Sequence, residues 1–234
     1  MLTMDCNHIH ASCMGTAPDH RYQDYVMVEE SESYLIAAIA DGFGSKVSSQ
    51  RGSNLICQLI IDFFKKDDAD RFALGFTDGI IEEWYQFLSG KGVSSSDCQT
   101  TSSFLFFDKL SSRILMGSIG DSPIFYRQNK GEVVALSHSK EFLNETECIG
   151  GRTHPHYRLK ELIFDEQFDC LIATDGFADE ILEGKEDGLF EYLESKYTKI
   201  RVSERDTMLK RELVSTVKGL NPDDKTLFYC WINR

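Results

Sequence analysis

The sequence predicts an α+β protein in which antiparallel sheets pack together and carry helices on their outer faces. Short apolar runs typical of strands are numerous, and brief turns separate most of them. Segments with helical periodicity fall into two groups, at 48–88 and at 187–218, instead of following every strand. Because a parallel doubly wound sheet needs a helix after nearly every strand, this order argues against that fold.

The N-terminal third predicts a hairpin followed by two helices. The strands are expected at 25–30 and 33–40. Apolar residues then recur at helical spacing, at Leu55, Ile56, Leu59, Ile60 and Phe63, and a second helix is expected over 69–88. A connection rich in Gly and Ser follows at 90–97.

The rest of the chain predicts a meander, a long loop and a mixed C-terminal part. Strands are expected at 100–107, 113–119, 123–127, 133–136, 159–164, 169–174 and 225–233, and helices at 187–196 and 203–218. The stretch at 137–157 has little periodicity and is predicted to be a flap, since long loops in compact domains are often functional. Its His154 and His156 are interpreted as exposed side chains, with positioning of a phosphopeptide as the alternative.

Composition limits the class of protein. With 234 residues and 41% hydrophobic residues, the chain is expected to form one domain over 1–234 with a substantial core. A net charge of -13 argues against binding to nucleic acid or to anionic membranes, both of which need basic patches. The seven scattered cysteines and the lack of a leader or membrane-spanning pattern predict a reduced, cytoplasmic protein. We expect a monomer, because the apolar faces are accounted for by the core.

Residues of the types that bind zinc gather near the N-terminus. Cys6, His8 and His10 alternate as on one face of a strand, and Cys13 follows. The spacing matches no common structural zinc pattern. Two interpretations therefore stand, a zinc site and a strand with a polar face.

Acidic residues stand at the ends of several apolar runs. Asp41 and Asp175 each end a run and precede Gly, Asp121 follows the run at 113–119, and Asp223 precedes the last strand. An acid in this place puts a carboxylate at the rim of a sheet, and a neighbouring Gly leaves its own carbonyl open to a ligand. If several such strand ends meet, their carboxylates would bind hard divalent cations together. Hydrolysis of phosphoesters by two metal ions requires such a site.

Six short motifs recur in a familiar order. They are Gly15 with His20, Arg21, Gln23 and Asp24; Asp41-Gly42-Phe43-Gly44; Thr100-Thr101; Gly120-Asp121-Ser122; Asp175-Gly176-Phe177-Ala178-Asp179; and Asp223-Asp224-Lys225-Thr226. Together they resemble the metal-dependent serine/threonine protein phosphatases of the protein phosphatase 2C type, in particular the compact bacterial branch. The resemblance runs from about Gly15 to Trp231 and implies an α-β-β-α sandwich of two antiparallel sheets flanked by helix pairs.

The resemblance also implies roles for individual residues. Asp41 would bridge two Mn²⁺ or Mg²⁺ ions, and the carbonyl of Gly42 would bind one of them. Asp175 and Asp223 would bind the other ion, and Asp24 would act through a water. Asp121 would hold a third ion together with Asp175.

The sequence departs from the family pattern at three places. Phe43 replaces a His proposed to protonate the leaving group, so His20 is the candidate acid and a metal-bound water the alternative, or turnover is slower. Arg21 is the candidate phosphate ligand, although it lies one residue out of register and has a surface charge as its alternative role. Gln23 replaces an acid, which removes one negative charge from the site.

The expected function is hydrolysis of phosphoserine and phosphothreonine in proteins by a water or hydroxide that bridges two Mn²⁺ or Mg²⁺ ions. With this activity we also expect a phosphoprotein substrate and a role in signalling. The alternative is a catalytically weak or dead relative that serves as a phosphoprotein- or partner-binding regulatory module. The change at Phe43 motivates this alternative, whereas the retained aspartates argue against it.

Overall fold

The computed structural model describes residues 4–16, 21–66, 72, 75–136, 147–181, 183–216 and 221–234. The first sheet has the order β1-β10-β9-β6-β7, formed by β1 (Asp5–Cys13), β10 (Lys225–Asn233), β9 (Gln167–Ala173), β6 (Ile124–Gln128) and β7 (Val134–Leu136). The second sheet has the order β2-β3-β4-β5-β8, formed by β2 (Tyr25–Glu30), β3 (Tyr34–Ala40), β4 (Ser102–Asp108), β5 (Arg113–Ile119) and β8 (Arg158–Ile163). Each of these pairings is antiparallel.

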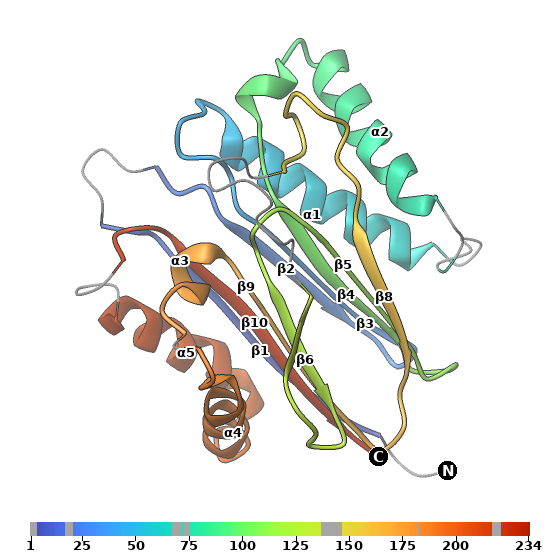
Figure 1. Cartoon of the computed structure of the whole chain (residues 1–234), viewed down its shortest axis with the longest axis vertical. Coiled ribbons are helices and arrows are strands. Elements are labelled where there is room, and N and C mark those ends of the chain that lie inside the picture. Colours follow the sequence, from blue (N-terminus) through green and yellow to red (C-terminus); the bar gives the residue numbers. More distant parts are fainter. Residues whose placement is uncertain are drawn as a thin grey trace.

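The helices lie on the outer faces of the two sheets (Figure 1). They are α1 (Ser49–Lys65), α2 (Phe76–Gly90), the short α3 (Asp175–Ala178), α4 (Glu186–Tyr197) and α5 (Val202–Thr216). The helices α1 and α2 cover the second sheet, and α4 and α5 cover the first (Figure 1). This arrangement confirms the predicted α+β class and the α-β-β-α sandwich.

The central strands are buried on both faces. In β3, Leu35 points into the core between the sheets, and the next residue, Ile36, points toward the helices. In β10, Phe228 lies between the sheets and Tyr229 packs under α4 and α5. Continuous apolar runs therefore mark the middle of each sheet, as expected for strands covered by layers on both sides.

Element bounds agree closely with the sequence predictions, with two differences. The strands predicted at 25–30, 113–119 and 225–233 coincide with β2, β5 and β10. The helix predicted over 69–88 corresponds to α2, which begins at Phe76 within the described residues. The motif that begins at Asp175 forms a single turn of helix, α3. This helix was not among the predicted ones, because four residues are too few to show a helical period.

The predicted flap is described only in part. Residues 137–146 lie outside the described residues, and within 147–157 Ile149 forms an isolated antiparallel bridge with Thr100. Within the described ranges, no helix combines the length and apolar character needed to cross a lipid bilayer.

Candidate metal centre

Asp41 stands where β3 ends, and the strand beside it fixes its backbone. The amide N–H of Asp41 donates to Thr101 Oγ1 at 3.1 Å, and its carbonyl accepts from Thr101 N at 2.8 Å and from Thr100 Oγ1 at 2.9 Å. Thr100 also bridges to Gly42 on one side and to Ile149 on the other. The two threonines therefore hold the carboxylate-bearing turn and the described part of the predicted flap in one short ladder.

Close packing explains the glycine after Asp41. A Cβ atom at Gly42 would lie 2.9 Å from the carbonyl oxygen of Gln23 and 2.9 Å from the backbone carbon of Ser49. Gln23 is buried, and its side-chain amide donates to Ser49 Oγ at 2.6 Å and to the Phe43 carbonyl at 3.2 Å. Gln23 thus supports the turn after Asp41, a role that its position next to Asp24 did not reveal.

Asp24 is buried and is held by hydroxyl groups of the first sheet. Thr174 Oγ1 donates to Asp24 Oδ2 at 2.8 Å, and Thr226 also hydrogen-bonds to this carboxyl. Burial raises the pKa of Asp24 to about 7, and the charge of Asp224 acts in the same direction while the two hydroxyls oppose it. The hydroxyl groups thereby favour the ionised form that a cation would need.

Asp41 and Asp175 interact with an overlapping group of acids. Burial raises the pKa of Asp41 well above its usual value, and the charges of Asp24 and Asp175 raise it further. The pKa of Asp175 is raised to about 6. Burial is the largest cause, and the charges of Asp121 and Asp223 act in the same direction. Asp41 shares hydrogen bonds with the carboxyl groups of Asp24 and Asp175. Carboxylates from both sheets therefore face one another at a single edge.

The five predicted acids form a linked series. Asp24, Asp41 and Asp121 come from strand ends of the second sheet, and Asp175 and Asp223 come from the first. Electrostatic interactions join Asp24 to Asp41 and Asp41 to Asp175. They also join Asp175 to Asp121 and to Asp223. In the described part of the chain, the group of potential ligands whose atoms all lie within 4.8 Å of one another is a different one, Asp78 with His154 and His156.

Asp224 joins the first motif to the last. Its Oδ1 accepts from Gly15 N at 2.8 Å, and its Oδ2 accepts from Gln23 N at 2.7 Å. A Cβ at Gly15 would lie 2.2 Å from the Pro222 carbonyl oxygen, which explains the glycine there. Asp224 is therefore a positioning residue for Asp24, which directly follows Gln23.

Lys225 is a residue of the site region that sequence reasoning missed. Its side chain is fully buried, and Nζ donates to the Gly176 carbonyl at 2.5 Å and to Glu180 Oε1 at 2.7 Å. The only signal in the sequence was a lysine placed between Asp224 and Thr226 at the start of an apolar strand. It ties the start of β10 to α3, the helix that begins with Asp175.

Two further residues of the first motif were predicted to belong to the site. Arg21 is exposed, and His20 lies outside the described residues. Phe43, which stands where the family pattern has His, has a half-buried side chain. A proton donor and a phosphate ligand at these positions stay predictions.

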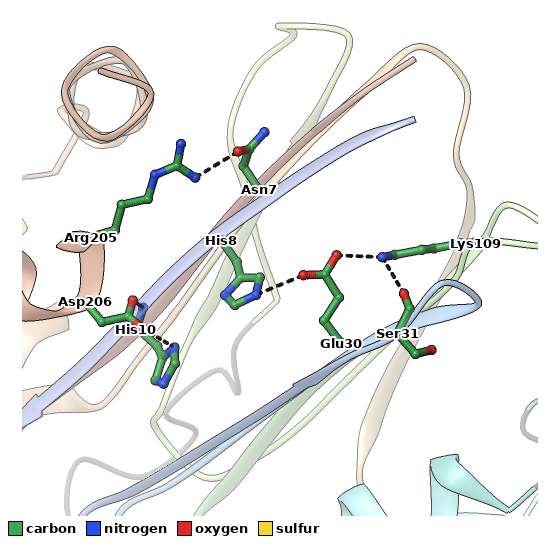
Figure 2. A network of polar contacts seen from close by, with 8 residues as sticks. All are labelled: Asn7, His8, His10, Glu30, Ser31, Lys109, Arg205 and Asp206. Atoms are coloured by element: carbon green, nitrogen blue, oxygen red, sulfur yellow. Dashed lines mark hydrogen bonds and ion pairs between the residues drawn. The ribbon is translucent and has the colours of Figure 1, made fainter. Parts of the chain in front are cut away.

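The N-terminal zinc interpretation is wrong for the cysteine pair. Cys6 packs between the two sheets, whereas Cys13 faces the helices, so the thiols lie on opposite faces of β1. Each histidine has a carboxylate partner (Figure 2). His8 Nε2 lies 3.3 Å from Glu30 Oε2, and His10 Nδ1 lies 3.4 Å from Asp206 Oδ2.

Both the sequence and the fold of this chain resemble those of known proteins. The family model of protein phosphatase 2C matches residues 17–216. No curated protein matches the sequence significantly. The catalytic domain of the serine threonine protein phosphatase PstP, in complex with two manganese ions, has a TM-score of 0.69 at 18% identity, and the match covers 99% of this chain and 100% of that one.

Two further solved structures have the same fold. The S. agalactiae serine/threonine phosphatase has a TM-score of 0.68 at 16% identity, covering 97% of this chain and 99% of that one. RsbX in complex with magnesium has a TM-score of 0.65 at 15% identity, covering 100% of both chains. Identities this low show a common fold, and the family model, which spans most of the sequence, shows the family. The chain belongs to the protein phosphatase 2C family.

Proposed function

We propose that this protein is a phosphatase that hydrolyses phosphoserine and phosphothreonine in proteins and depends on Mn²⁺ or Mg²⁺. One observation carries the proposal. Carboxylates from the ends of strands in both sheets meet at one edge of the sandwich, where burial and then the charges of neighbouring carboxylates raise the pKa of Asp41 and of Asp175. Groups that repel in this way at neutral pH favour the binding of cations between them.

The donor atoms fit the proposed ions. Mn²⁺ and Mg²⁺ prefer carboxylate and carbonyl oxygens, and the site offers five carboxylates and the backbone carbonyl of Gly42. Five carboxylates are more than a single Mg²⁺ ion usually takes from a protein, which favours two or three ions over one. Such ions, when bound, would supply an activated water and neutralise charge on the phosphoryl oxygens.

The chain's own residues would position this chemistry. Asp41 is central, because it contacts Asp24 of its own sheet and Asp175 of the other. Asp175 and Asp223 would hold the second ion, and Asp121 would share a third with Asp175. Asp24, oriented by the Thr174 hydroxyl, would accept a hydrogen bond from a water molecule in the site.

The proton for the leaving group and the grip on the phosphate are proposed to come from the N-terminal motif. Phe43 has no proton to donate, so His20 is the candidate acid and Arg21 the candidate phosphate ligand. A positioned acid contributes roughly 10²–10⁴-fold to rate. Turnover that survives replacement of His20 by Gln would assign protonation to water instead.

Replacing Asp41 with Asn tests the metal centre. We expect Asp41→Asn to lower Mn²⁺-dependent hydrolysis of p-nitrophenyl phosphate by more than the roughly 10–100-fold typical of losing an outer-shell partner. EDTA should abolish the activity of the wild type. The matched control is Asp62→Asn on the exposed face of α1, which should leave the rate unchanged. Activity that resists both EDTA and Asp41→Asn would overturn the proposal.

The second candidate is a regulatory module that binds phosphoprotein without turning it over. The phenylalanine at position 43 is the observation that favours it, since the family pattern has a proton donor there. The two functions separate in one experiment with a phosphoserine peptide. Release of phosphate that requires Mn²⁺ supports the phosphatase, and saturable peptide binding without release supports the module.

Phosphoprotein substrates, a role in signalling, a cytoplasmic location and a monomeric state belong to the same proposal. The net charge of -13 supports partners other than nucleic acid or anionic membranes.

A further inference from the structure

The geometry points to a second metal site, separate from the acidic centre, formed by Asp78, His154 and His156. Asp78 lies in the first turn of α2, and the two histidines flank Pro155 in the segment that leads into β8. One ligand atom from each of the three residues lies within 4.8 Å of the other two. The site would bind a divalent ion of the zinc class.

The backbone presents the two histidines together. Pro155 and Tyr157 are buried, whereas His154 and His156 are exposed, as expected where alternate residues of an extended segment point to opposite sides. Tyr157 anchors the segment by donating from its hydroxyl to Ser102 Oγ at 2.6 Å. The imidazole rings lie 5.3 Å apart between centroids, so both reach the same region of solvent.

The spacing suits a metal ion. His156 Nδ1 and Asp78 Oδ1 lie 3.6 Å apart. Ligands about 2.0–2.2 Å from a tetrahedral ion lie roughly 3.4 Å from one another. The observed spacing is therefore close to that of two ligands on one ion, and a ring nitrogen of the exposed His154 lies within 4.8 Å of a ligand atom of each of the other two residues.

The ligand types select a different ion from the acidic centre. Imidazole suits Zn²⁺, Co²⁺ and Ni²⁺, whereas Mg²⁺ prefers oxygen donors and keeps most of its waters. Two histidines with one carboxylate occur in zinc and iron sites that leave a position open for water. An ion pair between Asp78 and His156 alone would not require His154 to lie beside them.

The test is a Zn²⁺ titration of the full chain in the presence of excess Mg²⁺, which keeps the acidic centre supplied. The readout is the imidazole ¹⁵N resonances of the six histidines together with calorimetric stoichiometry. We expect Zn²⁺ to shift the resonances of His154 and His156, and the double variant His154→Gln/His156→Gln to bind one equivalent fewer than the wild type. Asp78→Asn should weaken binding while the wild-type stoichiometry remains.

The controls separate this site from other zinc binding. The double variant His8→Gln/His10→Gln removes two histidines from β1 and should keep the wild-type stoichiometry. Because His154 and His156 are exposed, their replacement should leave the urea midpoint of unfolding close to that of the wild type. Equal stoichiometry in the wild type and His154→Gln/His156→Gln, or unmoved resonances of both residues, would overturn the inference. The measurement needs no phosphatase activity, so its outcome does not depend on the proposed function.

Discussion

At the scale of single residues, Lys225 shows how a charged side chain can be built into the core. Its ammonium group is fully buried between the Gly176 carbonyl and Glu180. A buried charge is tolerated when its hydrogen bonds are made, and removing one partner of such a pair costs about 3–5 kcal/mol. Because Glu180 keeps some contact with water, we expect the lower end of that range here.

The variant Lys225→Met tests this role. Urea unfolding should show a loss of about 3 kcal/mol, since the Gly176 carbonyl and the Glu180 carboxylate both lose their donor. The exposed Lys199→Met is the matched control and should change stability by no more than about 0.5 kcal/mol. Equal losses in the two variants would show that Lys225 makes no special contribution.

At the scale of elements, α3 places Asp175 by packing against the start of β10. A Cβ atom at Gly176 would lie only 2.0 Å from the backbone oxygen of Asp224. Any larger residue must push α3 away from the start of β10, the strand that Asp223 and Asp224 precede. The glycine of this Asp-Gly pair therefore sets the distance between Asp175 and Asp223.

Gly176→Ala is expected to destabilise the protein by about 1–3 kcal/mol, the usual cost of overpacking, and to lower Mn²⁺ affinity in the same variant. Calorimetry and urea unfolding would measure the two effects. The control is Gly188→Ala in α4, where an added Cβ meets no atom within 4 Å and should stabilise the helix by about 1 kcal/mol. A wild-type Mn²⁺ affinity in Gly176→Ala would contradict the positioning role.

At the scale of the whole molecule, a polar network joins the edges of the two sheets (Figure 2). Glu30 of β2 receives Lys109 Nζ at 2.6 Å and faces His8 of β1 at 3.3 Å. On the other side of β1, Arg205 of α5 donates to Asn7 Oδ1 at 2.8 Å. The edge strands β1 and β2, which belong to different sheets, are therefore linked by a polar contact as well as by the apolar core.

This link predicts a pH dependence of stability. Hydrogen bonds from His8 and then Lys109 lower the pKa of Glu30 from its ordinary 4.5 to about 2. Folding thus favours the ionised carboxylate, so its contribution is fully present above pH 4.5 and is lost as the pH falls toward 2. The difference in urea midpoint between wild type and Glu30→Gln should be largest near neutral pH and shrink through that window.

The matched control is Glu29→Gln. Glu29 pairs with Lys65 at 3.0 Å, and both side chains are 40% exposed, so the pair contributes little. Its removal should shift the urea midpoint less than Glu30→Gln does at neutral pH. A Glu30→Gln difference that stays constant down to about pH 2 would contradict the role of the network.

Most elements could be predicted from local pattern. The strands at 25–30, 113–119 and 225–233 were bounded by turn residues and apolar runs, which are local signals. The four-residue α3 was missed because it is shorter than the window in which a helical period can be seen.

The sequence by itself determined the α+β class, the order of the strands along the chain, and the acids that stand at the strand ends. The class and the strand order follow from the hydrophobic period, and the acids follow from the short motifs. Both signals come from residues that are neighbours in the sequence. Only the tertiary structure decided that Thr174 and Thr226 hold Asp24, that Lys225 braces α3, and that Asp78 meets two histidines. Such pairs are far apart in the chain, and they come together only after the two sheets stack and the helices cover them.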